Sequence, residues 1–99
     1  MNFYISWQKF PHKFREEREA YLAKVRQKHG QRGLDKYLEV EKEQKGHCKI
    51  CKRKMILLRD HKPGTKKFRG LLCSWCNSIL GNIERMPWVL GNISKYLNV

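Results

Sequence analysis

Residues 48–51 read Cys-Lys-Ile-Cys and residues 73–76 read Cys-Ser-Trp-Cys, and these two stretches decide the fold. Two residues separate the cysteines of each pair, and 21 residues separate the pairs. Two such knuckles place four thiolates at the corners of a tetrahedron, the arrangement that Zn²⁺ prefers. We therefore predict a closed structural zinc site with Cys48, Cys51, Cys73 and Cys76 as ligands. With four cysteines present, His47 is not expected to replace one of them.

The size of the chain explains why such a site is needed. It has 99 residues, of which 40% are hydrophobic, and 22 basic and 9 acidic side chains give it a net charge of +13. This length fits one small domain, whose core rarely stabilises a fold alone. Metal binding to thiolates can contribute on the order of 10 kcal/mol to folding. The large positive charge indicates a polyanionic partner, most often nucleic acid.

Several protein classes are excluded by the sequence. No apolar run of about 18 residues that could span a membrane is present. The first residues show no basic segment followed by an apolar one, so we expect a cytoplasmic protein that is not secreted. In that compartment cysteines favour metal binding over disulfides. The sequence also lacks a glycine-rich phosphate loop and a G-x-S-x-G motif.

Helical periodicity dominates the N-terminal half. Apolar residues at spacings of three, four and seven predict a helix over residues 12–29, with Pro11 in its first turn and Gly30 after its end. Residues 31–33 are expected to form a turn. A second, shorter helix is predicted over residues 35–44.

We predict that the chain divides after residue 45. Residues 1–45 would form an N-terminal helical region packing on the remainder, with Trp7 and Phe10 holding an arm against the body. Residues 46–99 would form a zinc-stabilised finger with a C-terminal helix. The predicted fold class is α+β, a small and mostly helical domain.

The C-terminal half predicts a hairpin followed by two helices. Apolar runs at residues 55–58 and 68–72 flank a Pro-Gly turn, a pattern typical of two strands. A helix is expected over residues 74–80, with Gly81 after its end. The last helix is expected over residues 86–97. Its inward-facing stripe is predicted to comprise Met86, Val89, Leu90, Ile93 and Leu97.

Asp60, His61 and Asn77 form a candidate catalytic group. Asp60 and His61 leave the first predicted strand and Asn77 follows the last cysteine, so a zinc site joining hairpin and helix would bring them together. The carboxylate and amide oxygens suit a hard cation such as Mg²⁺, and the imidazole can accept a proton from an attacking water. These are the requirements of phosphodiester hydrolysis. In the simpler alternative, the same residues only form hydrogen bonds in a turn and a helix.

Positive charge surrounds this group. Residues 46–99 carry 11 basic residues and two acidic ones, Asp60 and Glu84. A carboxylate among so many cations favours a metal ligand, because it would otherwise repel phosphate. The predicted DNA-contact residues are Lys52, Arg53, Lys54, Lys62, Lys66, Lys67 and Arg69. The basic residues of the first helix either form a solvated face or also touch phosphates; they are Lys24, Arg26, Lys28 and Arg32.

Four motifs follow one another in this half of the chain. They are Cys48-Lys-Ile-Cys51, Leu57-Leu-Arg-Asp-His61, Phe68-Arg-Gly-Leu-Leu-Cys-Ser-Trp-Cys-Asn77 and Ile79-Leu-Gly81. In this order and spacing they resemble the phage recombination endonuclease VII family of HNH (His-Me finger) nucleases. The resemblance covers roughly residues 34–97.

The resemblance implies a ββα-metal finger around a structural zinc, with His61 as general base and Asp60 and Asn77 as ligands of a catalytic Mg²⁺ or Mn²⁺. It implies cleavage of duplex or branched DNA to 5′-phosphate and 3′-hydroxyl ends, often by a homodimer. The chain departs from the family at Lys62, where many relatives have His or Asp. It also departs at Leu80, where the resolvase carries an assisting acid, so a preference for branched DNA stays open.

Two functions other than catalysis are compatible with the sequence. One is a zinc-finger protein that binds nucleic acid without cutting it, and the other is a zinc-knuckle subunit that binds another protein. Net charge argues against an ordinary protein interface. Asp60, at the centre of a cationic patch, argues against a protein that only binds phosphates.

Overall fold

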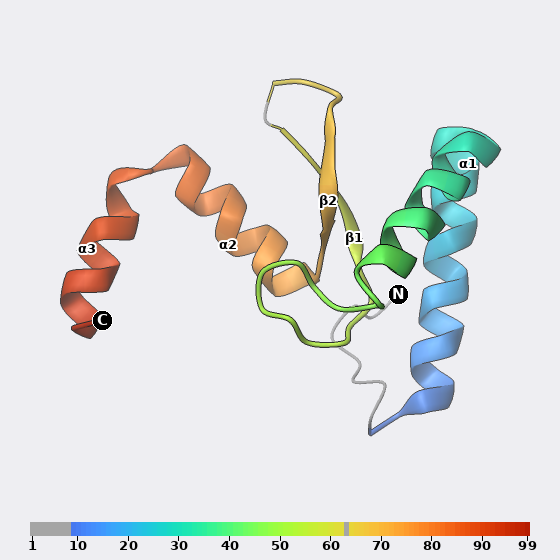
Figure 1. Ribbon diagram of the computed structural model, residues 1–99, viewed down its shortest axis with the longest axis horizontal. Coiled ribbons are helices and arrows are strands. Elements are labelled where there is room, and N and C mark those ends of the chain that lie inside the picture. Colours follow the sequence, from blue (N-terminus) through green and yellow to red (C-terminus); the bar gives the residue numbers. More distant parts are fainter. Residues whose placement is uncertain (1–8, 63) are drawn as a thin grey trace.

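The hairpin lies between one long N-terminal helix and two C-terminal helices (Figure 1). The computed structural model describes residues 9–62 and 64–99. Its elements are α1 (Pro11–Glu43), β1 (Leu58–His61), β2 (Phe68–Leu72), α2 (Ser74–Arg85) and α3 (Trp88–Leu97). The predicted α+β fold class, mostly helical with one hairpin, is confirmed. Of the two residues predicted to hold an N-terminal arm, Trp7 lies outside the described residues, and Phe10 is 59% exposed and does not pack as expected.

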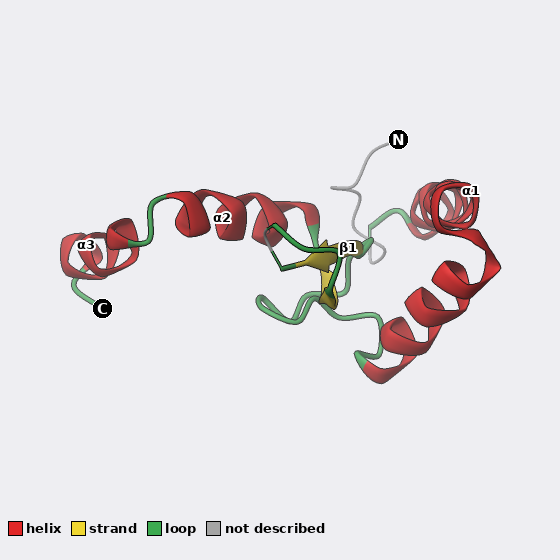
Figure 2. Ribbon diagram, turned by 90° about the horizontal axis from the view of Figure 1, so that it is seen from above, coloured by secondary structure: helices red, strands yellow, loops and turns green. Residues whose placement is uncertain are grey.

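Helix α1 bends at one glycine. Gly30 has φ 72° and ψ −176°, a conformation essentially restricted to glycine, and both flanking segments are helical. The predicted helix end at Gly30 is confirmed, but the turn expected over residues 31–33 is wrong because the helix resumes at once. Figure 2 shows the resulting angle between the first arm (residues 11–29) and the second arm (residues 31–43).

The bend makes the two arms approach closely. A Cβ atom added to Gly33 would lie 2.3 Å from the Cβ of His29, nearer than side chains tolerate. Gly33 therefore serves as a contact point for the first arm rather than as part of a turn.

The core joins α1 to the hairpin and to the loop before it. Tyr37 is fully buried, and its hydroxyl donates a hydrogen bond to the carbonyl oxygen of Leu57 at 2.6 Å. Residues 55–57 are buried but precede β1, whereas the sequence predicted them to start the strand. They pack into the core before the chain begins to pair with β2. The proposed division after residue 45 stays a prediction, and the core itself includes residues from both sides of it.

The two strands pair antiparallel with an irregular register. Asp60 lies opposite Gly70 and His61 lies opposite Phe68, so β2 carries one extra residue, Arg69. Such a β-bulge bends the strand and redirects side chains. The irregularity falls at Asp60 and His61, two of the three residues predicted to be catalytic.

Helices α2 and α3 extend away from the body (Figure 1). Helix α2 runs to Arg85 rather than ending before Gly81, because Gly81 keeps a helical backbone instead of the positive φ that ends a helix. The apolar stripe of the last helix does not face inward as predicted. Leu90 is 56% exposed and Leu97 is 60% exposed, since the described part of the chain places no core beneath them.

Candidate metal centre and active site

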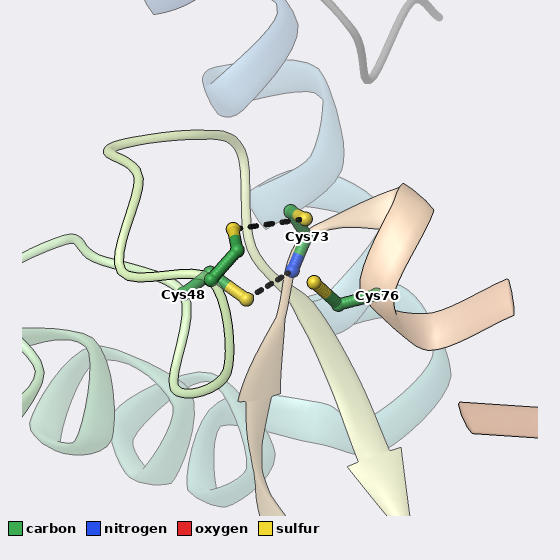
Figure 3. Close-up of side chains that lie close together, drawn as sticks. Cys48, Cys73 and Cys76 are labelled. Atoms are coloured by element: carbon green, nitrogen blue, oxygen red, sulfur yellow. Dashed lines mark hydrogen bonds between the residues drawn. The ribbon is translucent and has the colours of Figure 1, made fainter. Parts of the chain in front are cut away.

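The four cysteines converge where the loop after α1, the end of β2 and the start of α2 meet. Their sulfur atoms all lie within 4.8 Å of one another, and Cys48, Cys73 and Cys76 are buried. In Figure 3 the side chains of these three residues point toward a common centre. The predicted clustering of the four cysteines is confirmed.

The sulfur spacing fits a tetrahedral metal site. The Sγ atoms of Cys51 and Cys73 are 3.8 Å apart. A tetrahedron with Zn–S bonds of about 2.3 Å has edges of about 3.8 Å, so this pair already has the separation of two zinc ligands. The cluster is closed on all sides by thiols, as in structural sites, and offers no position for a substrate.

Backbone groups hold the cluster in shape. The backbone N–H of Cys73 donates to Sγ of Cys48 at 3.4 Å, and the N–H of Lys52 donates to the Cys48 carbonyl at 3.0 Å. Lys52 takes φ 66°, which turns the chain tightly after the first pair. These contacts bring the two knuckles together from positions far apart in the sequence.

The environment of the thiols favours metal binding. Burial raises the pKa of Cys51, but hydrogen bonds from Arg53 and from neighbouring thiols outweigh it and lower this pKa to about 6. Burial and the neighbouring thiols raise the pKa of Cys76 to about 12. The surroundings therefore favour the thiolate form of Cys51, and binding of a cation would displace the proton of a neighbouring thiol such as Cys76.

Gln44 connects the end of α1 to this centre. Its side-chain oxygen accepts from the N–H of Leu71 at 3.1 Å, and its Nε2 donates to the carbonyls of Leu71 and His47 at 3.0 and 2.9 Å. The amide thereby fixes the loop entering Cys48 against the last residues of β2. His47 pairs with Lys54 in an isolated bridge and, as expected, is not part of the cysteine cluster.

Asp60 lies at the edge of the core with its carboxylate engaged. It is only 9% exposed, and Arg69 donates to both of its oxygens, from Nε at 2.8 Å and from Nη2 at 3.2 Å. The same Nη2 donates to Glu84 on α2 at 2.7 Å. These two carboxylates raise the pKa of Arg69 and keep its charge fixed between β1 and α2.

His61 is exposed and lies where two pockets meet. A pocket of about 420 Å³ is lined by His61 and Asp60 together with Lys28, His29 and Arg59. A second pocket of about 680 Å³ joins His61 to α2, where Ser78 and Glu84 line it. The imidazole can therefore be reached from both the α1 side and the α2 side.

Asn77 lies in the first turns of α2, half-buried, directly after Cys76. Its backbone N–H donates to the Cys73 carbonyl at 2.9 Å, which anchors it to the cysteine cluster. Helix α2 packs against both strands, so the strand end with Asp60 and His61 faces this helix. Within the described part of the chain, no hydrogen bond joins Asn77 to Asp60 or to His61.

The residues predicted to contact DNA lie in two places. Arg53 donates to Sγ of Cys51 at 3.3 Å and its guanidinium lies 4.4 Å from the ring centroid of Trp75, so it lies beside the cysteine cluster. Lys52 and Lys54 are its neighbours in the chain. The others lie in or beside the hairpin loop; they are Lys62, Lys66, Lys67 and Arg69. Lys66 lines the pocket that contains His61.

Some residues of this pocket were not predicted as part of the site, among them Arg59 and His29, and Lys28 was predicted only as one alternative phosphate contact of the first helix. Lys28 and His29 belong to α1, so only the direction of the α1 bend could have placed them here, and the sequence shows a glycine but no direction. Arg59 directly precedes Asp60 in β1. Glu84, the other acid of residues 46–99, lies near Asp60 because both carboxylates contact Arg69.

Comparison with known families gives one decisive result. The family model for recombination endonuclease VII matches residues 22–99. The chain belongs to the recombination endonuclease VII family. This membership confirms the resemblance seen in the motifs, and it implies nuclease activity with DNA as substrate. Searches among curated proteins and among solved structures gave no match.

The comparison also bears on the first arm of α1. The match begins at residue 22, within that arm, so the pocket wall formed by Lys28 and His29 falls inside the matched region.

Among the described residues, no helix is both long and apolar enough to cross a membrane.

Proposed function

We propose that this endonuclease VII family member is a metal-dependent HNH endonuclease that hydrolyses DNA phosphodiester bonds at His61. The observation that carries the proposal is the position of His61, exposed beside the engaged carboxylate of Asp60 and open to two pockets. An imidazole there accepts the proton of the attacking water. The hairpin, the following helix and the cysteine cluster between them are in the order expected for a ββα-metal finger.

Zn²⁺ is the cation we assign to the cysteine cluster, and Mg²⁺ or Mn²⁺ the one we assign to Asp60 and Asn77. Carboxylate and amide oxygens are suitable ligands for a hard divalent cation. Such a cation, when bound, stabilises the negative charge that develops on the phosphate and on the leaving 3′ oxygen. Arg69 competes with such a cation because it donates to both oxygens of Asp60, although each oxygen keeps a second lone pair that a cation could use.

The cleavage we propose leaves 5′-phosphate and 3′-hydroxyl ends. Branched DNA is one candidate substrate, as expected of a junction resolvase. The acid that assists in resolvases is replaced here by Leu80, but Glu84 follows Asn77 by seven residues and so lies two turns further on the same face of α2. Glu84 is the one acidic residue of α2, and its hydrogen bond from Arg69 holds it near the site. We also propose that the protein acts in the cytoplasm, that of the host cell if the gene is carried by a phage.

The positive residues of the finger guide the strand to His61. Lys62, Lys66 and Lys67 lie in or beside the hairpin loop and are exposed, so they can contact phosphates directly. Arg53 is held by Cys51 and Trp75 and would contribute mainly by its charge.

A second copy of this chain is the partner we propose for α2 and α3. Apolar side chains cover these helices although they project from the body; the most exposed are Ile79, Trp88, Leu90, Tyr96 and Leu97. Apolar surface of this extent is typical of an interface. In a homodimer each subunit would cut one strand, which suits an enzyme acting on duplex DNA.

A non-catalytic zinc-finger protein that binds nucleic acid is the alternative. It would use the same cations but has no need for Asp60, His61 and Asn77 as a group. A nicking assay separates the two functions. Supercoiled plasmid and a synthetic four-way junction are incubated with the purified protein in Mg²⁺, Mn²⁺ or EDTA.

We expect nicking in Mg²⁺ or Mn²⁺ and none in EDTA. Asp60→Ala, His61→Ala and Asn77→Ala should each lower the cleavage rate by a factor of about 100 or more while zinc content stays at one per chain. Asn92→Ala, which removes the same amide from an exposed position of α3 that lines neither pocket, is the matched control. Undiminished cleavage by His61→Ala would refute the role of His61, and binding without nicking by the unaltered protein would support the alternative.

A further inference from the structure

The pocket beside His61 has a wall built from α1. Lys28 and His29 come from the end of the first arm, and they face Arg59, Asp60 and His61 of β1 across the pocket. A neighbouring pocket of about 350 Å³ shares Lys28, His29, Arg59 and His61 and continues along the first arm. The two together form a groove between α1 and the hairpin that begins at the proposed catalytic residue.

The charges of this groove select an anion. Lys28, Arg59 and Lys66 line the larger pocket, and Asp60 is the acidic residue among its lining side chains. Asp60 shares Arg69 with Glu84, and three cations against this one carboxylate leave the pocket positive. A phosphate group is the anion that a strand crossing His61 would bring here.

Arg59 is held rigidly at the centre of this groove. Its Nη1 lies 2.7 Å from Nε2 of His29, and its guanidinium carbon lies 5.3 Å from the ring centroid of Phe68. Its backbone N–H donates to the hydroxyl of Tyr21 at 3.0 Å. The Nε atom is buried and has no hydrogen-bond partner among the described residues. A buried donor without a partner costs free energy, so this placement is not explained by stability.

His29 is the residue that orients Arg59. A guanidinium can only donate, so Nε2 of His29 must accept, and the ring must be neutral. Burial and the charges of Arg59 and Lys28 lower the pKa of His29, which favours that neutral form. The bend at Gly30 ends the first arm at this contact.

We propose that Lys28 and Arg59 form a second phosphate-binding subsite, which takes a phosphate of the DNA strand next to the one hydrolysed at His61, with His29 as the positioning residue for Arg59. This proposal rests on the proposed function for its ligand. It extends the nucleic-acid surface from the finger onto α1.

The test measures binding without cleavage. A fluorescein-labelled DNA duplex is titrated in EDTA at several salt concentrations with the unaltered protein and with Lys28→Gln. Loss of one phosphate contact should weaken binding and reduce the slope of log K against log salt concentration by about 0.9. Lys13→Gln is the matched control, because Lys13 is also exposed on the first arm but about 22 Å away along the helix.

His29 is tested by a pair of variants in the same assay. His29→Leu removes the acceptor and should weaken binding, whereas His29→Gln keeps a side-chain acceptor and should restore much of the loss. Thermal unfolding of each variant checks that the fold is intact. Arg59→Gln is included and should lose at least as much affinity as Lys28→Gln.

Equal affinity and salt slope for Lys28→Gln and Lys13→Gln would overturn the subsite. Equal binding by both His29 variants would overturn the positioning role of His29. Because EDTA prevents metal-dependent cleavage, neither result depends on His61 being catalytic. Failure of the proposed function would instead appear as strong binding, sensitive to Lys28→Gln, with no nicking in Mg²⁺.

Discussion

Asp60 and Glu84, the only acidic residues between positions 46 and 99, meet on the guanidinium of Arg69. The Nη2 atom of Arg69 donates to the carboxylate of Asp60 at 3.2 Å and to that of Glu84 at 2.7 Å, so both acids accept a hydrogen bond from the same nitrogen atom. The arrangement places a cation between β1 and α2 at the point where we propose that a divalent cation binds. Arg69 therefore competes with the metal for Asp60.

Neutralising Arg69 tests this competition. In Arg69→Gln the carboxylates of Asp60 and Glu84 lose their counter-ion, and we expect half-maximal cleavage at a lower Mg²⁺ concentration than in the unaltered protein. The rate of plasmid nicking is measured across a Mg²⁺ titration. Arg85→Gln is the control, since Arg85 is a second arginine of this half, on α2, whose guanidinium donates to Asn82 rather than to Asp60. An unchanged Mg²⁺ requirement with weaker DNA binding would show that Arg69 contacts DNA instead.

The cysteine cluster predicts a strict dependence of folding on metal. Cys48 and Cys73 are fully buried, and metal binding is worth on the order of 10 kcal/mol, comparable to the whole stability of a small domain. Cys73→Ser, or removal of zinc by a chelator, should therefore abolish cooperative unfolding as followed by circular dichroism. Ser78→Ala should melt as the unaltered protein does. A cooperative, undiminished melt after complete zinc removal would contradict this.

The features predicted from sequence are those that depend on local spacing. The cysteine pairs, the hairpin around the Pro-Gly turn and the helix end at Gly30 each depend on residues a few positions apart. The lengths of α1 and α2 were less predictable, because a glycine ends a helix only where its backbone leaves the helical region. Gly30 does so, and Gly81 does not.

The contacts that shape the candidate site join residues far apart in the sequence. Arg69 reaches Glu84 because of a bulge in β2, and Arg59 reaches His29 because α1 bends toward the hairpin. Neither the bulge nor the direction of the bend leaves a periodic signal. The apolar stripe of α3 does leave a periodic signal. That signal predicts a buried face, but it does not show which surface covers it.

The buried hydroxyl of Tyr37 predicts a measurable contribution to stability. Its hydrogen bond to the Leu57 carbonyl joins the second arm of α1 to the loop before β1. Burial raises the pKa of Tyr37 far above its ordinary value, so the hydroxyl keeps its proton and remains a donor. Tyr37→Phe should lower the free energy of unfolding by about 1–3 kcal/mol, because the carbonyl stays buried and unpaired.

Denaturant titration followed by tryptophan fluorescence measures the effect of Tyr37→Phe. Tyr96→Phe removes the same oxygen from a side chain that is 90% exposed, and should change the free energy of unfolding little. Equal values for the two variants would show that the Tyr37 hydrogen bond contributes nothing net.

The apolar surface of α3 predicts self-association. Leu90 and Ile93 are 56% and 42% exposed, and covering them against a second copy would remove apolar surface from water. We expect a dimer by analytical ultracentrifugation for the unaltered protein and a monomer for Leu90→Glu. Asn92→Glu places the same charge on an exposed position off this stripe and should leave the dimer intact. A monomeric unaltered protein would refute the pairing.

The bend at Gly30 gives the last prediction, because it depends on one residue's backbone. With φ 72° and ψ −176°, alanine at position 30 is strained although nothing lies within 4 Å of the added Cβ. Gly30→Ala should lower the free energy of unfolding by about 1–3 kcal/mol. Gly91→Ala, equally open but within α3, should raise it by about 0.5–1 kcal/mol.

Denaturant unfolding of the two glycine variants measures both changes in the free energy of unfolding, the decrease expected for Gly30→Ala and the increase expected for Gly91→Ala. The DNA affinity of Gly30→Ala should fall as well, since straightening the helix would carry Lys28 and His29 away from Arg59. Gly91→Ala should bind DNA as the unaltered protein does. Stabilisation by both substitutions would mean that residue 30 is helical in solution and that α1 is straight, which would remove the wall of the groove beside His61.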